Sequence, residues 1–234
     1  MTDRIIGILG GMGPEATADF YQEIIRLTPA KTDQEHIPVI IYADPRVPER
    51  TRAILQGGED PVPHLIKAAV ALERAGAGIL AIPCNTAHYF LPRIGPKVSI
   101  PILNMIEETY ASIRARTGDI RRAGLLATRG TIGSGVYGEA FARHGVEIVV
   151  PDASDQERLQ QAIFQVKAGA YDRTRQDLFE RIGATLIAAG ARVVILGCTE
   201  IPLGFDVSRA DYPVVNATRV LAQAAVDWAL GKRA

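Results

Sequence analysis

Short runs of apolar, largely β-branched residues alternate with longer amphipathic segments along the whole chain. This alternation is typical of parallel strands joined by crossover helices, because such strands are buried on both faces while each helix exposes one. In the first half we expect strands at residues 5–9, 38–42, 79–82 and 100–103 and helices at 15–28, 64–75 and 86–94. In the second half we expect strands at 122–126, 147–150, 193–196 and 214–215 and helices at 135–143, 155–168, 174–189 and 217–230.

The two halves of the chain share landmarks, which indicates that one unit has been duplicated. An Ala-Gly-Ala sequence precedes the predicted strand that leads to Cys84, and the same sequence precedes the strand that leads to Cys198. Pro-Ile-Leu before Asn104 is matched by Pro-Val-Val before Asn216. The sequence therefore predicts an α/β protein of two duplicated α/β lobes, each with a central, mostly parallel four-stranded sheet flanked by helices.

The boundary between the lobes is expected near residue 105. We expect the first lobe to span residues 1–105, the second to span 106–211, and the C-terminal helical segment 212–234 to pack back on the first. Ligands of open parallel sheets bind at the carboxyl ends of the strands, so two such sheets predict an active site in the cleft between the lobes. Cys84 and Cys198 both lie at strand ends of that kind.

Composition narrows the possible partners and the compartment. With 234 residues, 47% of them hydrophobic, the chain is long enough to bury its own core. Basic and acidic residues number 26 each, and no long run of one sign occurs, so neither a nucleic acid nor a membrane is an expected partner. The N-terminal segment lacks the features of a signal peptide, and no apolar stretch approaches the roughly 20 residues of a membrane span. We therefore expect a cytoplasmic protein, with two free thiols and no metal site.

Each cysteine lies where a strand turns into a predicted helix. A helix N-terminus stabilises a thiolate and lowers the pKa of the thiol, and its free N–H groups can hold a carboxylate. A single free cysteine is more often a small buried apolar residue, but two at the same place in duplicated halves favour a function. Racemisation at an amino-acid Cα without an electron-sink cofactor needs an acid-base group on each face of the carbon, and a pair of thiols supplies both.

Three motifs carry a resemblance to a known family. They are Gly10-Gly11-Met12-Gly13-Pro14-Glu15-Ala16-Thr17, Pro83-Cys84-Asn85-Thr86-Ala87-His88 and Gly197-Cys198-Thr199-Glu200. Almost from end to end, the sequence resembles the aspartate/glutamate racemases and, among them, the aspartate racemases. The resemblance implies an isomerase that needs no pyridoxal phosphate or other cofactor, is usually a homodimer, and acts on a small acidic amino acid.

The resemblance also implies roles for single residues. Cys84 and Cys198 match the family's two catalytic cysteines; some relatives carry threonine at the first position and are restricted to one enantiomer, so this pair implies racemisation in both directions. Arg50 and Lys167 match an arginine and a lysine that hold the substrate carboxylates in aspartate-specific members, as a guanidinium fork and a compact charge can. Further candidates for lining the cleft are Met12, Asn85, Thr86, Thr128, Thr131, Thr199 and Glu200. Glu200 equally fits a partner of a lysine or a helix cap.

Other functions remain open at this point. Gly11-Met12-Gly13-Pro14-Glu15-Ala16 fits the G-x-G-x-x-A fingerprint of an NAD-dependent dehydrogenase, although Asp44 lies too far along the chain to bind the ribose well. A two-lobed amino-acid-binding protein would share the cleft without needing thiols. Glutamate racemases, hydantoin racemases and arylmalonate decarboxylases use related scaffolds. Aspartate and glutamate differ by one methylene, which is worth only about 1–3 kcal/mol in a pocket.

Overall fold

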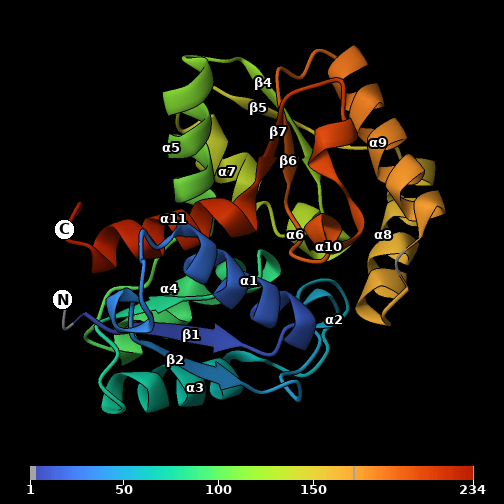
Figure 1. Cartoon of the computed structure of the whole chain (residues 1–234). Helices are drawn as coiled ribbons and strands as arrows, with labels where there is room; N and C mark the ends of the chain where they lie inside the picture. Colours follow the sequence, from blue (N-terminus) through green and yellow to red (C-terminus); the bar gives the residue numbers. More distant parts are fainter. Residues whose placement is uncertain (1–3, 171, 234) are drawn as a thin grey trace.

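The computed structural model describes residues 4–170 and 172–233 and has two α/β lobes (Figure 1). Residues 1–3, at the start of the predicted range 1–105, lie outside the described residues. So does residue 234, at the end of the predicted range 212–234. The first sheet has the order β2-β1-β3 and the second β5-β4-β6-β7, with every pairing parallel. The strands are β1 Ile6–Gly10, β2 Val39–Ala43, β3 Ile79–Ala81, β4 Arg122–Leu126, β5 Glu147–Val149, β6 Val194–Leu196 and β7 Val214–Asn216. The predicted two-lobed α/β class is confirmed.

The first sheet has one strand fewer than expected. The predicted strand at residues 100–103 pairs with β3 only through an isolated bridge between Leu80 and Ile102. The backbone N–H of Leu80 donates to Pro101 O, and that of Leu103 donates to Leu80 O, both over 2.9 Å. Pro101 has no N–H to extend the ladder, and the chain enters a helix after Asn104. The segment therefore touches the sheet at one point and leaves it.

Most predicted helices are present, with ends shifted by a few residues. They are α1 Pro14–Leu27, α3 Val62–Arg74, α7 Val136–Ala142, α8 Ala153–Lys167, α9 Arg173–Ala188 and α11 Ala217–Ala229. The helix predicted at 86–94 is instead a 3₁₀ turn, η2 Thr86–Phe90, followed by the single turn α4 Leu91–Ile94. Pro92 lacks the N–H that a continuous α-helix through this segment would use.

Several helical segments were not predicted. They are α2 Arg50–Leu55, α5 Met105–Thr117, α6 Arg129–Gly133, α10 Ile201–Gly204 and the 3₁₀ turns η1 Asp33–Glu35, η3 Gly95–Lys97 and η4 Val207–Arg209. Asn104 caps α5 by accepting from the backbone N–H groups of Ile106 and Glu107, and Asn216 caps α11 in the same way. The two asparagines are therefore N-caps of equivalent helices in the two halves of the duplication.

Helices cover both faces of each sheet, because parallel strands are apolar on both sides. In the first sheet, Ile6 and Ile8 pack toward α1 and α11, while Leu9 packs toward α3. In the second, Leu196 faces α8 and α9, and Ile195 faces α5 and α7. The helices cover the faces of the sheets, and the connecting loops follow the carboxyl ends of the strands. The predicted site residues lie in or next to these loops.

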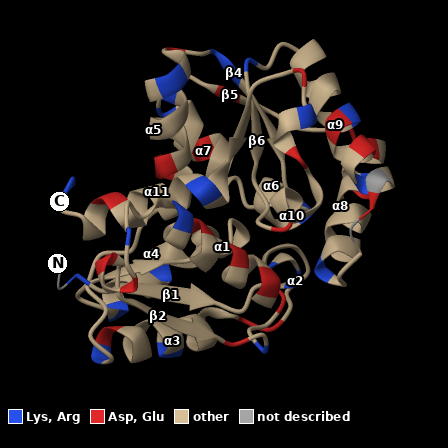
Figure 2. Ribbon diagram, in the orientation of Figure 1, with Lys and Arg blue, Asp and Glu red and all other residues tan. Residues whose placement is uncertain are grey.

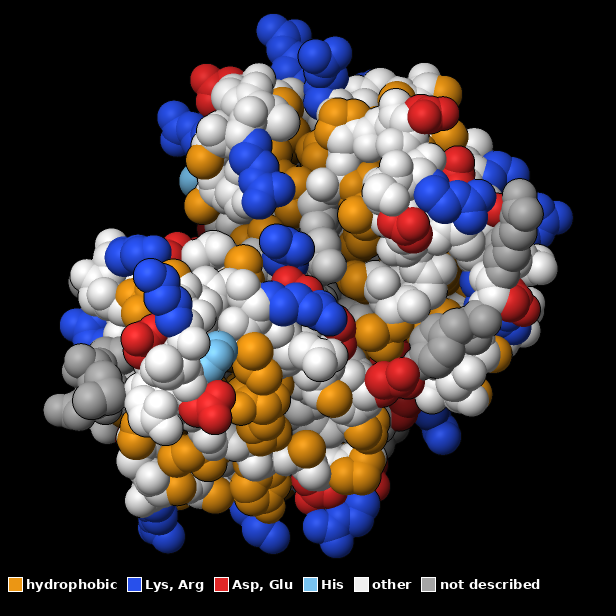
Figure 3. Space-filling model, viewed as in Figure 1, with side chains coloured by type: hydrophobic (Ala, Val, Ile, Leu, Met, Phe, Trp, Pro, Cys, Tyr) orange, Lys and Arg blue, Asp and Glu red, His pale blue; other side chains and the backbone are white. Residues whose placement is uncertain are grey.

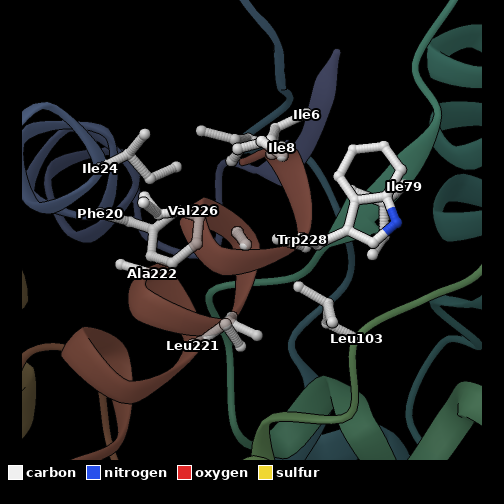
Figure 4. Close-up of a cluster of buried hydrophobic side chains, with 14 of the residues drawn as sticks. Ile6, Ile8, Phe20, Ile24, Ile79, Leu103, Leu221, Ala222, Val226 and Trp228 are labelled. Atoms are coloured by element: carbon white, nitrogen blue, oxygen red, sulfur yellow. The ribbon is translucent and has the colours of Figure 1, made fainter. Parts of the chain in front are cut away.

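The C-terminal helix α11 lies against α1, next to the first sheet (Figure 1). Figure 4 shows Ala222 and Val226 of α11 beside Phe20 and Ile24 of α1. Val220 on the same helix instead joins the core of the second lobe, while β7, directly before it, pairs with β6. Helix α11 therefore packs against both lobes.

Basic and acidic residues are interspersed over the helices of both lobes (Figure 2). The same mixture covers the face shown in Figure 3, where hydrophobic side chains fill the spaces between charged ones. Among the described residues, no helix is long and apolar enough to cross a lipid bilayer.

Candidate active site

A cavity between the lobes collects nearly all of the predicted site residues. Its walls are formed by Met12, Glu49, Arg50, Thr51, Cys84, Asn85, Thr86, Thr128, Phe164, Lys167, Gly197, Cys198, Thr199 and Glu200. The cavity is narrow and has room for about one water molecule. An amino acid can enter only after the walls move apart.

The two cysteines occupy equivalent turns in the two lobes. Cys84 lies three residues after the end of β3, and Cys198 lies two residues after the end of β6. Each cysteine carbonyl accepts a 3.2 Å hydrogen bond from the N–H three residues further on, that of Ala87 or Ile201. Both are free thiols and nearly buried, 6% and 5% exposed. The duplication thus places one thiol from each lobe in a single cavity.

The expected acidity of the thiols is wrong for Cys198. Burial raises the pKa of its thiol well above the ordinary value, and the Glu200 carboxylate raises it further, while Lys167 offsets part of the effect. The following helix, α10, is a single turn, so it has too few aligned peptide dipoles to favour a thiolate strongly. Cys198 is therefore held as a thiol in this structure.

Glu200 binds directly to Cys198. The Cys198 thiol donates to Glu200 Oε2 over 3.0 Å, and the Thr199 hydroxyl donates to the same oxygen over 3.2 Å. The other oxygen, Oε1, accepts from Gly13 N over 3.2 Å, across the lobe boundary. Glu200 is 3% exposed, so these contacts replace water around its carboxylate.

Lys167, at the C-terminal end of α8, reaches the same carboxylate. Its Nζ lies 3.6 Å from Glu200 Oε1, and its side chain is 27% exposed. Burial alone would lower the pKa of Lys167, but Glu200 and then the two cysteines raise it, and the net direction is upward. Lys167 is therefore a cation in the cavity that both cysteines line.

Arg50 begins α2 and is buried against the cavity wall. Its Nη1 group donates to the carbonyls of Val47 and Pro48, each over 3.1 Å, while Nε is buried without a hydrogen-bond partner among the described residues. Helix α2 packs closely against α6 of the other lobe. Arg50 thus brings a positive charge and an unused donor to the site.

The three predicted threonines form a hydroxyl cluster across the lobe boundary. Thr86 Oγ1 lies 3.1 Å from Thr128 Oγ1 and 2.8 Å from Thr131 Oγ1, and the last two are 3.1 Å apart. Thr128 also caps α6 by accepting from the backbone N–H of Thr131. Thr131 differs from the other predicted site residues because it is not among the residues that line the cavity. In this conformation the three hydroxyls join the lobes to each other.

Two further residues near the site escaped the sequence prediction. His88 Nε2 accepts from the backbone N–H of Met105 over 3.0 Å, so the ring proton is on Nδ1, which donates to Cys84 O over 2.9 Å. Tyr137 of α7 donates to Asn85 Oδ1 over 2.6 Å. The helical spacing of His88 from Cys84 was a visible signal, whereas nothing in the sequence pairs Tyr137 with Asn85.

The glycine turn after β1 does not have the surroundings of a dinucleotide site. The N–H of Gly13 at the start of α1 donates to the Glu200 carboxylate, and a carboxylate in that place repels a pyrophosphate. Asp44 makes a two-pronged ion pair with Arg46. Gly11 is required for another reason: its φ is +92°, and a Cβ there would lie 2.4 Å from the backbone of Asp44.

Among the described residues, no group of three or more His, Cys, Asp or Glu side chains is arranged to hold a metal ion. Two of the four charged side chains of the cavity are the cations Arg50 and Lys167, which can bind a carboxylate, and the other two are Glu49 and Glu200.

Known proteins resemble this chain over nearly its whole length. It is 29% identical over 229 residues to the broad specificity amino-acid racemase RacX of Bacillus subtilis (strain 168), with 95% of this chain and 96% of that protein covered. The structure of Picrophilus torridus aspartate racemase matches with a TM-score of 0.86 at 29% identity, covering 97% of this chain and 94% of the other. An aspartate racemase homologue from Pyrococcus horikoshii OT3 matches with a TM-score of 0.79 at 28% identity, covering 97% and 99%.

The family match agrees with the geometry. The description Asp/Glu/Hydantoin racemase applies to residues 9–225, a stretch that includes both cysteine turns and every residue that lines the cavity. With two thiols in one inter-lobe cavity and this match over most of its length, the chain belongs to the Asp/Glu/hydantoin racemase family and is an isomerase of the racemase type.

Proposed function

We propose that this enzyme interconverts L- and D-aspartate by moving a proton between Cys84, Cys198 and the substrate Cα, without a cofactor. The observation that carries the proposal is that one cysteine from each lobe lines the same cavity. One sulfur, as thiolate, takes the Cα proton, and the other, as thiol, delivers its own proton to the opposite face. The electron pair left by the first step forms the new C–H bond, so one turnover exchanges the protonation states of the two sulfurs.

The polar groups of the cavity support an acidic amino acid as substrate. Arg50 and Lys167 supply two positive charges, and Asn85 Nδ2, like Arg50 Nε, is a buried donor without a partner among the described residues. Such donors are costly to bury unless a ligand pairs with them. The two carboxylates of aspartate would pair with these donors and with the two cations.

A broader substrate range is the second candidate. The Bacillus subtilis relative, similar along its whole length, is a broad specificity amino-acid racemase. A pocket of this kind would also accept a side chain longer or shorter by one methylene, which changes binding by only about 1–3 kcal/mol.

The test is racemisation in deuterated water, followed by chiral chromatography and NMR at Cα. We expect L-aspartate to yield D-aspartate that carries deuterium at Cα, and glutamate and alanine to react more slowly. Cys84→Ala and Cys198→Ala should each lose racemisation while keeping the far-ultraviolet circular dichroism of the parent. Faster turnover of another amino acid would replace aspartate as substrate, and substantial activity in either cysteine variant would refute the two-thiol mechanism.

A further inference from the structure

The two duplicated cysteine turns carry different side chains at the second residue after the cysteine. In the second lobe, Glu200 lies two residues after Cys198 and accepts a hydrogen bond from its thiol over 3.0 Å. In the first lobe, the residue two after Cys84 is Thr86, whose hydroxyl bonds to Thr128 and Thr131 instead. Among the described residues, only the Cys198 thiol makes a hydrogen bond to a carboxylate.

The Glu200 carboxylate is fixed in place by donors on both oxygens. Oε2 takes the Cys198 thiol and the Thr199 hydroxyl, while Oε1 takes Gly13 N and lies 3.6 Å from Lys167 Nζ. An acceptor so placed favours the protonated form of Cys198, because a thiolate there would lose the hydrogen bond and face a like charge.

We propose that Glu200 holds the proton on Cys198 in the free enzyme, so that Cys84 is the thiolate that starts the reaction. The inference rests on the two-thiol function proposed above and assigns Glu200 a positioning role that acts through Cys198. Under this proposal, the two directions of racemisation start from different protonation states of the cysteine pair. These two states are unequally populated in the free enzyme.

Other charged or titratable groups near Cys198 do not cancel this preference. Lys167 offsets part of the effect on Cys198, but it is also ion-paired with Glu200, with 3.6 Å between Nζ and Oε1. Tyr137 is also close to Cys198, and burial keeps its phenol protonated by raising its pKa. Arg50 lies further along the same wall and repels Lys167 rather than pairing with Glu200. Burial and Glu200 together raise the pKa of Cys198, in agreement with the geometry.

The enzyme takes up one proton and gives one proton in each turnover. Cys84 thiolate removes the Cα proton, Cys198 thiol returns its proton to the other face, and the enzyme is left with Cys84 as thiol and Cys198 as thiolate. Cys198 then stands beside the Glu200 carboxylate, with Lys167 offsetting part of the repulsion. The resting form returns when Cys198 regains a proton and Cys84 loses the one it captured, either in the reverse reaction on the opposite enantiomer or by proton exchange with water.

The experiment is a thiolate titration by ultraviolet absorbance. The chain has two cysteines, so Cys84→Ser leaves Cys198 as the only thiol, and the double variant Cys84→Ser/Cys198→Ser supplies the tyrosine baseline. In Cys84→Ser we expect the thiol to titrate above its ordinary value of 9.0. Adding Glu200→Gln should lower the midpoint by about one pH unit or more, a roughly tenfold change in proton affinity.

Glu49→Gln is the matched control. Glu49 lines the same cavity, but its carboxylate accepts from the backbone N–H of Arg52 and not from a thiol, so the midpoint should stay within a few tenths of a unit. A Cys198 midpoint at or below the ordinary value, or one that Glu200→Gln leaves unchanged, would overturn the proposal.

A second measurement covers the case in which Glu200→Gln does not fold. With Glu200 intact, the thiol in Cys198→Ser should ionise at lower pH than the thiol in Cys84→Ser, and the reverse order would overturn the proposal. The titration needs no turnover, so it separates the two levels of inference. If the protein is an active racemase whose two thiols ionise alike, only the role of Glu200 is refuted. If the thiols are unequal but no amino acid is racemised, the proposed function is refuted, and with it the part of Cys84 in starting a reaction, while the effect of Glu200 on Cys198 stands.

Discussion

The phenol of Tyr137 donates a 2.6 Å hydrogen bond to Asn85 Oδ1 and so joins the second lobe to the residue that follows Cys84. Both side chains are buried, Tyr137 at 1% and Asn85 at 2% exposure. Because Oδ1 is held by Tyr137, the amide presents Nδ2 as its remaining group, and that nitrogen has no partner among the described residues. The pair therefore decides which end of the amide is offered to a ligand.

Tyr137→Phe should lower the unfolding free energy and raise KM for aspartate. Removing the hydroxyl leaves a buried Asn85 oxygen unpaired, which costs about 1–3 kcal/mol, and frees the amide to rotate. Urea denaturation and initial-rate kinetics measure the two effects. The matched control is Tyr89→Phe, because Tyr89 is 46% exposed and should be insensitive to the loss of its hydroxyl. Unchanged stability and KM in Tyr137→Phe would show that the hydrogen bond has no such role.

Arg50→Lys should reduce kcat/KM for aspartate by roughly ten- to a hundredfold, because lysine keeps the charge but loses the two-pronged donor, and bonds to charged groups are worth about 1.5–3 kcal/mol. The loss for alanine, which has no side-chain carboxylate, should be smaller. Arg52→Lys on the exposed side of the same helix serves as control and should leave both rates unchanged. An equal loss for both substrates would place Arg50 away from the side-chain carboxylate.

Gly130→Ala should impair both stability and activity, because Gly130 lets α6 approach α2 across the lobe boundary. A Cβ on Gly130 would lie 2.5 Å from Thr51 Oγ1 and 2.9 Å from Thr51 Cα, so backbone must shift. Overpacking of this kind typically costs about 1–3 kcal/mol, and the shift would displace the neighbouring Arg50. Thermal denaturation and the racemisation rate measure the effect.

The comparison variant is Gly138→Ala, on α7. A Cβ there meets nothing within 4 Å, and alanine favours a helix interior by about 0.5–1 kcal/mol. Gly138→Ala should therefore raise the melting temperature slightly and leave the rate alone. Equal behaviour of the two glycine variants would rule out the close approach as the cause.

The stability of the fold should decrease in acid through His88. Burial lowers the pKa of His88 below its ordinary value of 6.5, so below that pH the unfolded chain takes up a proton that the folded chain does not. This contribution to stability is complete above pH 6.5 and is lost as pH falls toward the lowered pKa, at up to about 1.4 kcal/mol per pH unit.

Urea denaturation at several pH values checks this prediction through the slope. His88→Asn should weaken the dependence of unfolding free energy on pH below 6.5, whatever its effect at neutral pH. His36→Asn, at an exposed position, should keep the parental slope. A slope in His88→Asn equal to that of the parent would mean that His88 takes up a proton in the folded state as well.

Much of the architecture could be predicted because it rests on local patterns. Each of these patterns predicts the structure of the few residues around it. They are the apolar runs of the strands, the repeated Ala-Gly-Ala sequences and the asparagines at 104 and 216. Helix α5 was missed because its apolar side chains do not form one stripe: Met105 packs in the core of the first lobe and Ile106 in that of the second. Its cap at Asn104 and the glycine at 118 were the available signals.

The sequence by itself determined the two-lobed α/β fold and brought Cys84 and Cys198 to equivalent strand ends, because parallel strands and their turns are encoded in short stretches of chain. Only the tertiary structure decided what surrounds each thiol. Glu200 meets Gly13, and Thr86 meets Thr131, through the packing of one lobe on the other, and Lys167 reaches Glu200 from a helix more than thirty residues earlier in the same lobe. The acidity of a buried thiol depends on such neighbours and on the loss of water, and neither is visible in the order of residues along the chain.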